Sequence, residues 1–266
     1  MRVLVIYRGA FWGRFLGLII GCGFVPGIVQ AQTGAHEPAP RPMGASQMYS
    51  LMDPYWKSNT TKAATAWQSL NGVSGTMFYN DDWAEGYVLL QNQKRTPALW
   101  LRFNIYSNEI YFKQDSQVMV IDPSLSVREF GMSVNVAGAN RHIVFRDGYP
   151  MTGKNSPATF YQVVRDGEWS VLKHYTKRVA VRNNMTMGPE KVINDTEDWY
   201  LFDSASHQIV PFKPSKNGVM ELLPRYAEQM RLIIKERGLK LKDDGDWVIL
   251  FDELTVFVKN KNPASN

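Results

Sequence analysis

Cysteine is almost absent from this chain, and its one cysteine, Cys22, lies in an apolar run near the N-terminus. If that run is removed as a leader, the mature chain has no thiol. Disulfide bonds, cysteine-ligated metals and thiol redox chemistry are then excluded. With about 235 residues left, a hydrophobic core can still form without covalent cross-links.

Histidine is also scarce, and the four residues are His36, His142, His174 and His207. No two of them have the i, i+4 or short-loop spacing of a zinc site. The alternating acids of a calcium loop are missing as well. The acidic run at Asp81, Asp82 and Glu85 is better explained as a turn before a strand. We predict no metal and no cofactor.

Common catalytic motifs are missing too. The sequence has no Gly-x-Ser-x-Gly elbow and no glycine-rich phosphate loop that opens a helix. Ser170 and Lys173 match a loose Ser-x-x-Lys pattern, but an offset of three places their side chains on opposite faces of a strand. The sequence therefore predicts no catalytic residue and favours a protein that is not an enzyme, with a hydrolase left open as an alternative.

The N-terminus has the pattern of a secretory signal. Three arginines precede an apolar stretch at residues 15–25, and Val29 and Ala31 occupy the −3 and −1 positions of a cleavage site. The stretch is shorter than the roughly 20 residues of a membrane-spanning helix. We predict a signal peptide at residues 1–31 and an exported mature chain, periplasmic or at the cell surface, without a transmembrane span.

Cys22 leaves one alternative open. The run Ile19-Ile20-Gly21-Cys22 resembles a bacterial lipobox, in which the cysteine carries a lipid and becomes the first residue of the mature protein. Apolar residues continue past it as far as Val29, whereas a lipoprotein usually turns polar at this point. Cleavage after Ala31 is therefore the preferred interpretation, and lipid anchoring at Cys22 is the alternative.

Charge gives no indication of a nucleic-acid partner. The net charge of +5 includes the three arginines of the signal, so +2 remains on the mature chain. A balance so close to neutral does not favour a polyanion as the partner.

Residues 72–213 are expected to form a mainly antiparallel β domain. Apolar and polar residues alternate at 99–106, which is the period of a half-buried strand, and 109–113 returns after the turn at Ser107-Asn108. Asp166-Gly167 marks a second hairpin. Short strands separated by turns indicate a sandwich or a partial barrel, and we expect the others at 87–90, 118–121, 127–132, 142–146, 159–165, 168–178, 199–202 and 208–212.

Residues 214–266 change to helical periodicity. Ser215 is expected to cap a helix that ends before Pro224, and Pro224 to open a second helix that ends at Gly238. Apolar residues after Asp243-Asp244 favour a third helix over a strand. With residues 32–71 interpreted as a tether and a short helical arm, the expected fold class is α+β, an antiparallel β domain followed by C-terminal helices.

Several short motifs carry a family resemblance. They are Asn80-Asp81-Asp82-Trp83-Ala84-Glu85-Gly86-Tyr87-Val88, Leu101-Arg102-Phe103-Asn104, Glu109-Ile110-Tyr111-Phe112, Thr159-Phe160-Tyr161-Gln162, Leu172-Lys173 and Glu221-Leu222-Leu223-Pro224. On these motifs the chain resembles an uncharacterised family of secreted β-rich proteins of Bacteroidetes-type bacteria. The resemblance implies localisation and fold, and it carries over no functional residue.

Aromatic residues make up 12% of the sequence. Six of them are candidate ligand-binding residues, because on a concave sheet face they could line a groove for a lipid or a glycan: Trp100, Tyr106, Tyr111, Tyr161, Trp169 and Tyr175. Core packing and cross-strand pairing would explain the same residues without a ligand.

Three functional hypotheses follow. The first is a non-enzymatic binding or assembly role in the cell envelope, with a protein partner that pairs with a sheet edge. The second is a lipid- or glycan-binding module that uses the aromatic face. The third is a hydrolase whose site is assembled from distant residues, such as His142 or His174 with two carboxylates.

The intact mass of the exported protein tests the leader. We expect the unmodified mass of residues 32–266, because Ala31 ends the small-residue cleavage site. A chain that begins at Cys22 and carries the mass of a lipid would instead establish the lipobox interpretation.

Overall fold

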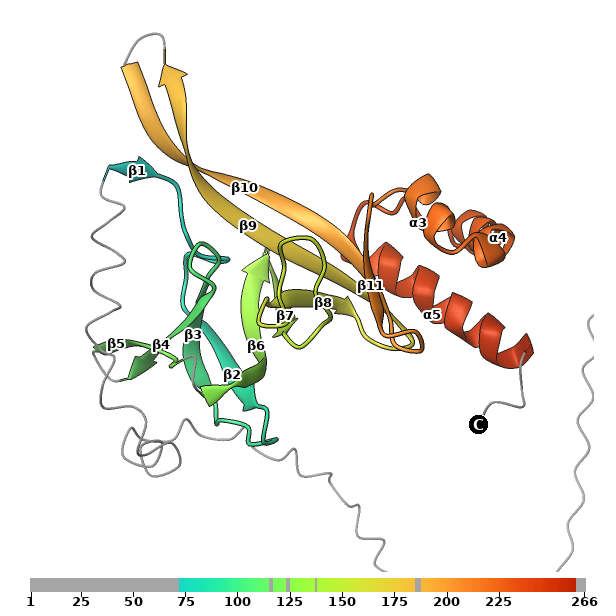
Figure 1. Cartoon of the computed structure of the whole chain (residues 1–266), viewed down its shortest axis with the longest axis horizontal. Coiled ribbons are helices and arrows are strands. Elements are labelled where there is room, and N and C mark those ends of the chain that lie inside the picture. Colours follow the sequence, from blue (N-terminus) through green and yellow to red (C-terminus); the bar gives the residue numbers. More distant parts are fainter. Residues whose placement is uncertain (1–71, 115–116, 123–124, 137, 185–187, 262–266) are drawn as a thin grey trace, which may run out of the picture. The chain divides into compact units, whose positions relative to one another are not determined.

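The computed structural model describes residues 72–114, 117–122, 125–136, 138–184 and 188–261 (Figure 1). All of these residues belong to a single compact unit of the chain. Within them, a mostly antiparallel sheet of eleven strands precedes three α-helices. The predicted α+β class is therefore confirmed. The predicted signal, tether and N-terminal helical arm lie outside the described residues. No described helix is both long and apolar enough to cross a membrane.

The strands form one open sheet in the order β1-β10-β9-β8-β7-β6-β2-β3-β4-β5, with β11 beside β10. The pairing of β1 with β10 is parallel, and the other ladders are antiparallel. The strands are β1 (Val73–Ser74), β2 (Ala84–Leu90), β3 (Leu99–Asn104), β4 (Glu109–Gln114), β5 (Gln117–Val120), β6 (Val127–Val136), β7 (Ala139–Arg146), β8 (Tyr161–Arg165), β9 (Trp169–Asn184), β10 (Gly188–Asp203) and β11 (Gln208–Phe212).

The hairpin of β3 and β4 forms as its alternating pattern predicts. Leu101 and Phe103 point into the core, whereas Trp100 between them is exposed. The turn is closed locally, because the Asn104 side-chain oxygen accepts a hydrogen bond from the backbone N–H of Ser107. The hairpin thereby fixes the start of β4, which borders a cleft described below.

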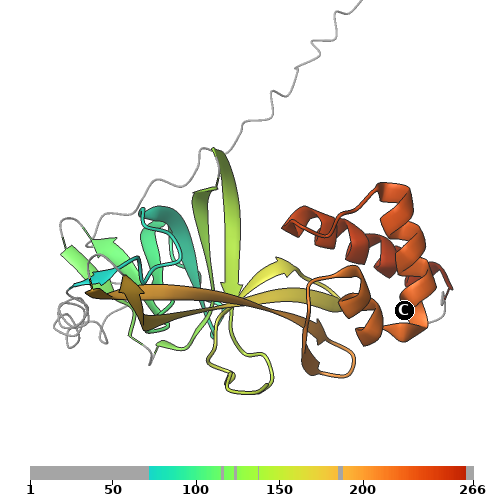
Figure 2. The same ribbon diagram turned by 90° about the horizontal axis from the view of Figure 1, so that it is seen from above.

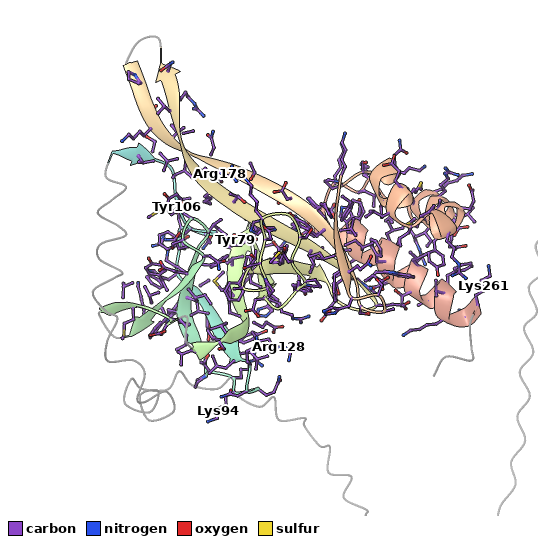
Figure 3. The ribbon with its side chains drawn as sticks, in the orientation of Figure 1. Tyr79, Lys94, Tyr106, Arg128, Arg178 and Lys261 are labelled. Atoms are coloured by element: carbon purple, nitrogen blue, oxygen red, sulfur yellow. The ribbon has the colours of Figure 1, made fainter. Side chains whose placement is uncertain are left out.

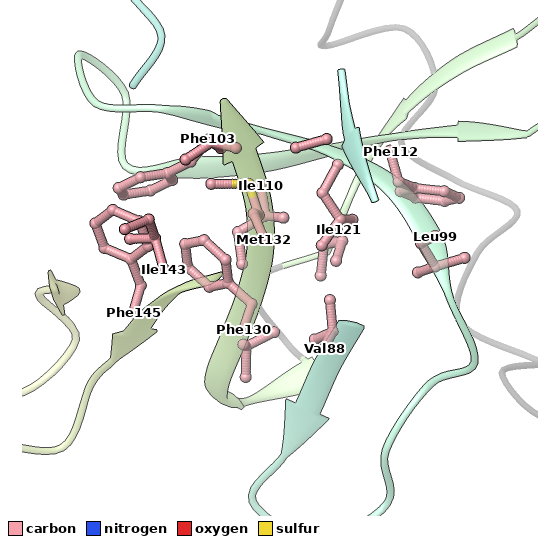
Figure 4. Close-up of a cluster of buried hydrophobic side chains, with 14 of the residues drawn as sticks. Val88, Leu99, Phe103, Ile110, Phe112, Ile121, Phe130, Met132, Ile143 and Phe145 are labelled. Carbon is pink, nitrogen blue, oxygen red and sulfur yellow. The ribbon is translucent and has the colours of Figure 1, made fainter. Parts of the chain in front are cut away.

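A first core lies among β2 to β7 (Figure 4). Phe103, Phe130 and Phe145 have ring centroids 5.0 Å apart in each pair, and Phe160 packs against the same group. Strands β2 and β6 approach closely here. A Cβ on Gly86 would lie 2.1 Å from the backbone oxygen of Gly131, so only glycine fits at that position.

A second core joins the helices to the opposite end of the sheet (Figure 2, orange to red). Trp247, fully buried, packs against Trp199 of β10 at a centroid distance of 5.4 Å. The helices are α3 (Lys216–Leu222), α4 (Ala227–Arg237) and α5 (Asp244–Lys261), with a 3-10 turn at Pro224–Tyr226 before α4. Helix α5 contacts β8 and β9.

The predicted helix boundaries are confirmed. Ser215 caps α3 by accepting a hydrogen bond from Gly218 N–H at 3.1 Å. Pro224 occupies the first position of the 3-10 turn, and Gly238 ends α4 with a φ of 63°, in the left-handed region that favours glycine. The segment after Asp243 is a helix and not a strand.

Strands β9 and β10 are far longer than the sequence pattern predicts. They pair with each other over 16 residues each, from Trp169↔Asp203 to Asn184↔Gly188. We call residues 174–184 and 188–198 the arm, because β10 is the only described strand with which β9 pairs beyond Lys173.

A partly buried polar network lies at the base of the arm. The Lys173 ammonium is 2.7 Å from Asp244 Oδ1 and 3.4 Å from Glu197 Oε2. The Gln162 amide donates to Asp244 Oδ2 at 3.3 Å and accepts a 2.6 Å hydrogen bond from the Tyr175 hydroxyl. Because Tyr175 packs on the first core and Asp244 begins α5, this network connects both cores.

Removing Asp244 tests the network. Lys173 is buried, and in Asp244→Ala its ammonium keeps only the longer ion pair with Glu197, at 3.4 Å. We expect the free energy of unfolding to fall by about 3 kcal/mol in urea denaturation. The double variant Lys173→Met/Asp244→Ala should lose less than the sum of the two single losses, because no uncompensated charge is buried.

A surface pair supplies the control. Arg231 and Glu228 form an ion pair on exposed α4 positions, and Arg231→Ala should cost no more than about 0.5 kcal/mol. Strictly additive losses for Lys173 and Asp244 would show that the pair is not coupled.

Candidate functional site

Three of the six predicted ligand residues are buried in separate clusters. Tyr111 packs edge-on against Phe78, Tyr161 lies with Tyr149 and Tyr200, and Trp169 belongs to the helix core. These side chains fill the interior. Sequence periodicity places them on strands, but it does not distinguish the inner face of this sheet from an accessible concave one.

The structure brings two predicted residues together. Tyr106, in the β3–β4 turn, and Tyr175, on β9, line one cleft of about 240 Å³ together with Phe160, His174 and Lys177. We call it the arm cleft. Trp100 is exposed on β3 and is not in its lining. The six residues therefore do not form one aromatic surface.

The arm cleft does not have the composition of a hydrolytic site. Its lining includes His174 but no carboxylate. Burial lowers the pKa of His174, although Asp198 on the paired strand opposes the effect, so the ring is neutral at pH 7. Lys177 lies 3.2 Å from Asp195 across the β9–β10 ladder. The cleft thus offers hydrogen-bonding groups and tyrosine rings.

The backbone edges of the arm are the second feature. On the side facing away from β10, β9 pairs with β8 only through Val171, Leu172 and Lys173. Residues 174–184 have no strand on that side among the residues that the structure describes. On β10, β1 occupies residues 191–192 and β11 occupies 199–203, which leaves 193–198 similarly open within the described chain.

Exposed side chains mark the two faces of the arm. Arg178 (labelled in Figure 3) and Arg182 are exposed on one face of β9. Val179 and Val181 alternate with them on the other face, and Val181 is 64% exposed. The basic residues near the base differ, since Lys173 and Lys177 have side chains only about 10% exposed and are ion-paired.

A larger cleft of about 430 Å³ lies where four connections of the sheet meet. Its lining comes from these connections, after β2, between β3 and β4, between β5 and β6 and between β7 and β8, and from the first residues of β4 and β6. Three carboxylates line it, those of Glu109, Asp122 and Asp147. We call it the acidic cleft, because the lining residues that the structure describes include no lysine, arginine or histidine.

The two clefts are neighbours. Asn108, Ala158 and Phe160 line both of them. The Asn108 amide donates to the Ala158 backbone oxygen at 3.2 Å, which joins the β3–β4 turn to the loop after β7. The hydrogen-bonded pair lies between the carboxylate-lined cleft and the cleft that contains His174 and Lys177.

Asp147 is a perturbed carboxyl group of the acidic cleft. Partial burial raises its pKa to about 6, and the nearby Arg128 (Figure 3) acts in the opposite direction. Its Oδ1 accepts a long 3.4 Å hydrogen bond from the Gln91 amide. The ionised carboxylate at neutral pH is thus incompletely compensated.

Sequence reasoning missed this cleft. Asp122-Pro123 and Asp147-Gly148 carry ordinary turn signals in the sequence. The approach of Asp122 to Asp147 depends on the order of the strands. The turn expected at Asp81 and Asp82 is present before β2, and Asp81 lies 3.8 Å from Arg102. In the described residues, no group of three or more histidine, cysteine or acidic side chains could hold a metal ion.

The raised pKa of Asp147 gives a pH dependence with a definite sign. The unfolded carboxyl titrates near 3.9, so the folded protein binds more protons between about pH 4 and 6. The contribution of Asp147 to stability is therefore most favourable below that window and falls as pH rises through it. Asp147→Asn should unfold at a higher urea concentration than the parent above about pH 7, and the gain should vanish near pH 4.

The control for this titration is Glu221→Gln, which removes an exposed carboxylate on α3. Its unfolding midpoint should follow that of the parent at every pH. A constant difference between Asp147→Asn and the parent from acid to neutral pH would contradict the titration.

Comparison with protein-family models, with curated proteins and with solved structures finds no match for this chain. The family resemblance in its short motifs stays a prediction from the sequence.

Proposed function

We propose that this protein is a non-enzymatic binding or assembly component of the cell envelope, whose arm receives an extended strand from a protein partner. The observation that carries the proposal is the open side of β9 at residues 174–184. Every second residue of an edge strand directs its N–H and C=O outward. A partner strand can satisfy these groups without any change in the fold.

Strand β1 illustrates this kind of pairing within the molecule. It comes from far away in the sequence and adds to β10 in parallel at Lys191 and Val192. A side-chain hydrogen bond from Ser74 to Glu190 supports the short ladder. The outer part of the arm, beyond its base at Lys173 and Glu197, therefore has the backbone geometry that an added strand requires.

The side chains define the chemistry of the partner. Arg178 and Arg182 present positive charge on one face, and Val179 and Val181 present apolar surface on the other. A complementary strand would alternate acidic residues with small apolar residues. Export, which the pattern of residues 1–31 supports, would place this interaction in the periplasm or at the cell surface.

The arm cleft supports a second candidate, a glycan-binding module. Tyr106 has a half-exposed ring, and His174, Thr176 and Asn108 supply polar groups around it. Aromatic rings that stack on sugars, next to a few polar groups that orient them, are typical of such sites. Loss of oligosaccharide-induced NMR shifts in Tyr106→Ala, with the fold retained, would favour this candidate.

Site-specific crosslinking in cells tests the strand-addition proposal. A photo-crosslinking amino acid in place of Val181, on the arm, should yield a discrete product identified by mass spectrometry. The same amino acid in place of Val256, which is similarly exposed on α5, should not. In the isolated complex, amide hydrogen exchange of residues 174–184 should slow, because strand pairing protects backbone N–H groups.

Charge reversal provides the matched comparison. Arg178→Glu/Arg182→Glu should reduce the crosslinked product about tenfold, whereas Lys94→Glu/Lys154→Glu, which reverses two exposed lysines elsewhere, should leave it unchanged. Equal products from positions 181 and 256, or a complex without added protection on β9, would reject strand addition.

A further inference from the structure

We propose that the acidic cleft is a binding site for an organic cation, namely a primary amine or guanidinium group on an aliphatic stem. The site is separate from the open edge of the arm. The proposal therefore does not rest on strand addition by a protein partner.

The size and floor of the cleft indicate a small organic ligand. Its volume of about 430 Å³ lies within the range of small-molecule sites. The floor is formed by Ile110, Ile121 and Val127, whose buried side chains also belong to the first core, and Phe160 lines one wall. An aliphatic stem on this floor would remove apolar surface from water on both molecules.

The charge of the lining selects a cation. Glu109 at the start of β4, Asp122 after β5 and Asp147 after β7 line the cleft, and the lining residues that the structure describes include no basic side chain. Glu109 is held in place, because its Oε2 accepts hydrogen bonds from Ser107 and from Tyr111. An ammonium or guanidinium group near Asp147 would supply the charge compensation and the hydrogen-bond donors that its long bond to Gln91 does not.

The rim of the cleft is preformed by backbone hydrogen bonds between neighbouring connections. The N–H of Gln91 donates to Ser126 at 2.9 Å, that of Ile121 to Ile110 at 2.8 Å, and that of Gly148 to Pro157 at 2.7 Å. A ligand would therefore enter a site that is already ordered, which lowers the entropic cost of binding.

The same features argue against other ligands. The three carboxylates are not grouped in a way that could hold a metal ion, and the cleft is much larger than an ion. An anion would meet carboxylates and no cation in the lining. The matching chemistry is shared by a free alkyl amine and by a lysine or arginine side chain of a peptide.

Calorimetric titration of the purified full chain tests the proposal. Cadaverine and agmatine should bind with a saturable isotherm near pH 8, and the anion hexanoate and the neutral pentanol should not. The affinity should fall about tenfold near pH 5, because Asp147 is then largely protonated. A lysine-containing tetrapeptide with an acetylated N-terminus, an amidated C-terminus and a free lysine side chain distinguishes the two sources. If this peptide binds more tightly than cadaverine, the ligand is a peptide side chain. If cadaverine binds more tightly, the ligand is a free amine.

Two variants assign the binding to the cleft. Asp147→Asn should weaken cadaverine binding about tenfold or more. Ala158→Trp, which puts a large side chain on an exposed lining position without changing charge, should abolish it. Glu221→Gln, on α3, should bind as the parent does.

Several results would overturn the proposal. One is that cadaverine gives no saturable isotherm with the parent protein. Another is that hexanoate binds as tightly as cadaverine. A third is that Asp147→Asn and Ala158→Trp both bind cadaverine as tightly as the parent does. Crosslinking from position 181 should be unaffected in Asp147→Asn, so failure of the amine site and failure of strand addition are separately visible.

Discussion

The ion pair between buried Lys173 and half-buried Asp244 is the interaction on which the arrangement of this fold depends. Strands β2 to β7 surround one core, and the helices cover another. Lys173 stands on β9 between them, and Gln162 extends its network to Tyr175. Burial raises the pKa of Tyr175 far above its ordinary value, so the hydroxyl stays protonated and remains a donor. The network links α5 to β8 and β9 through directional contacts, whereas apolar packing is not directional.

This base determines what the arm can do. A two-stranded ribbon is marginally stable by itself in water, and beyond the base the arm has few buried side chains, Val192 among them. Its conformation is set by the ladder between β9 and β10 and by continuity with the sheet. Because the base is anchored, the outer residues keep extended backbone geometry while their edges stay open. Basic side chains at 178 and 182 discourage pairing between two identical β9 edges, so the arm favours a different, acidic strand.

The sequence predicts the parts of the fold in which a local signal coincides with burial. Alternation in β3 and β4, the cap at Ser215 and the ends at Pro224 and Gly238 all have local physical causes, and each is confirmed. The outer arm was missed because it is exposed on both faces, so residues 179–198 lack the alternation that burial imposes. The six aromatic residues lie on or beside the expected strands, yet three of them are interior, since periodicity does not reveal which face another layer covers. The acidic cleft was beyond prediction because strand order alone brings its three carboxylates to one place.

Both candidate sites follow from the contrast between the packed core of strands β2 to β7 and the exposed arm. The connections between β2 and β8 end on a rigid core, so side chains such as Asp147 can be held partly desolvated without collapse of the cleft around them. The outer arm has no such core, and it can offer only its backbone and side chains that tolerate water. A small ligand requires a preformed cavity, whereas an added strand requires an extended edge. The Asn108–Ala158 bridge lies where these two environments meet. Because Asn108, Ala158 and Phe160 line both clefts, a ligand in the acidic cleft would contact residues that also border the arm cleft. Such a ligand would shift the geometry of the arm cleft only as far as it binds one arrangement of these shared residues better than another.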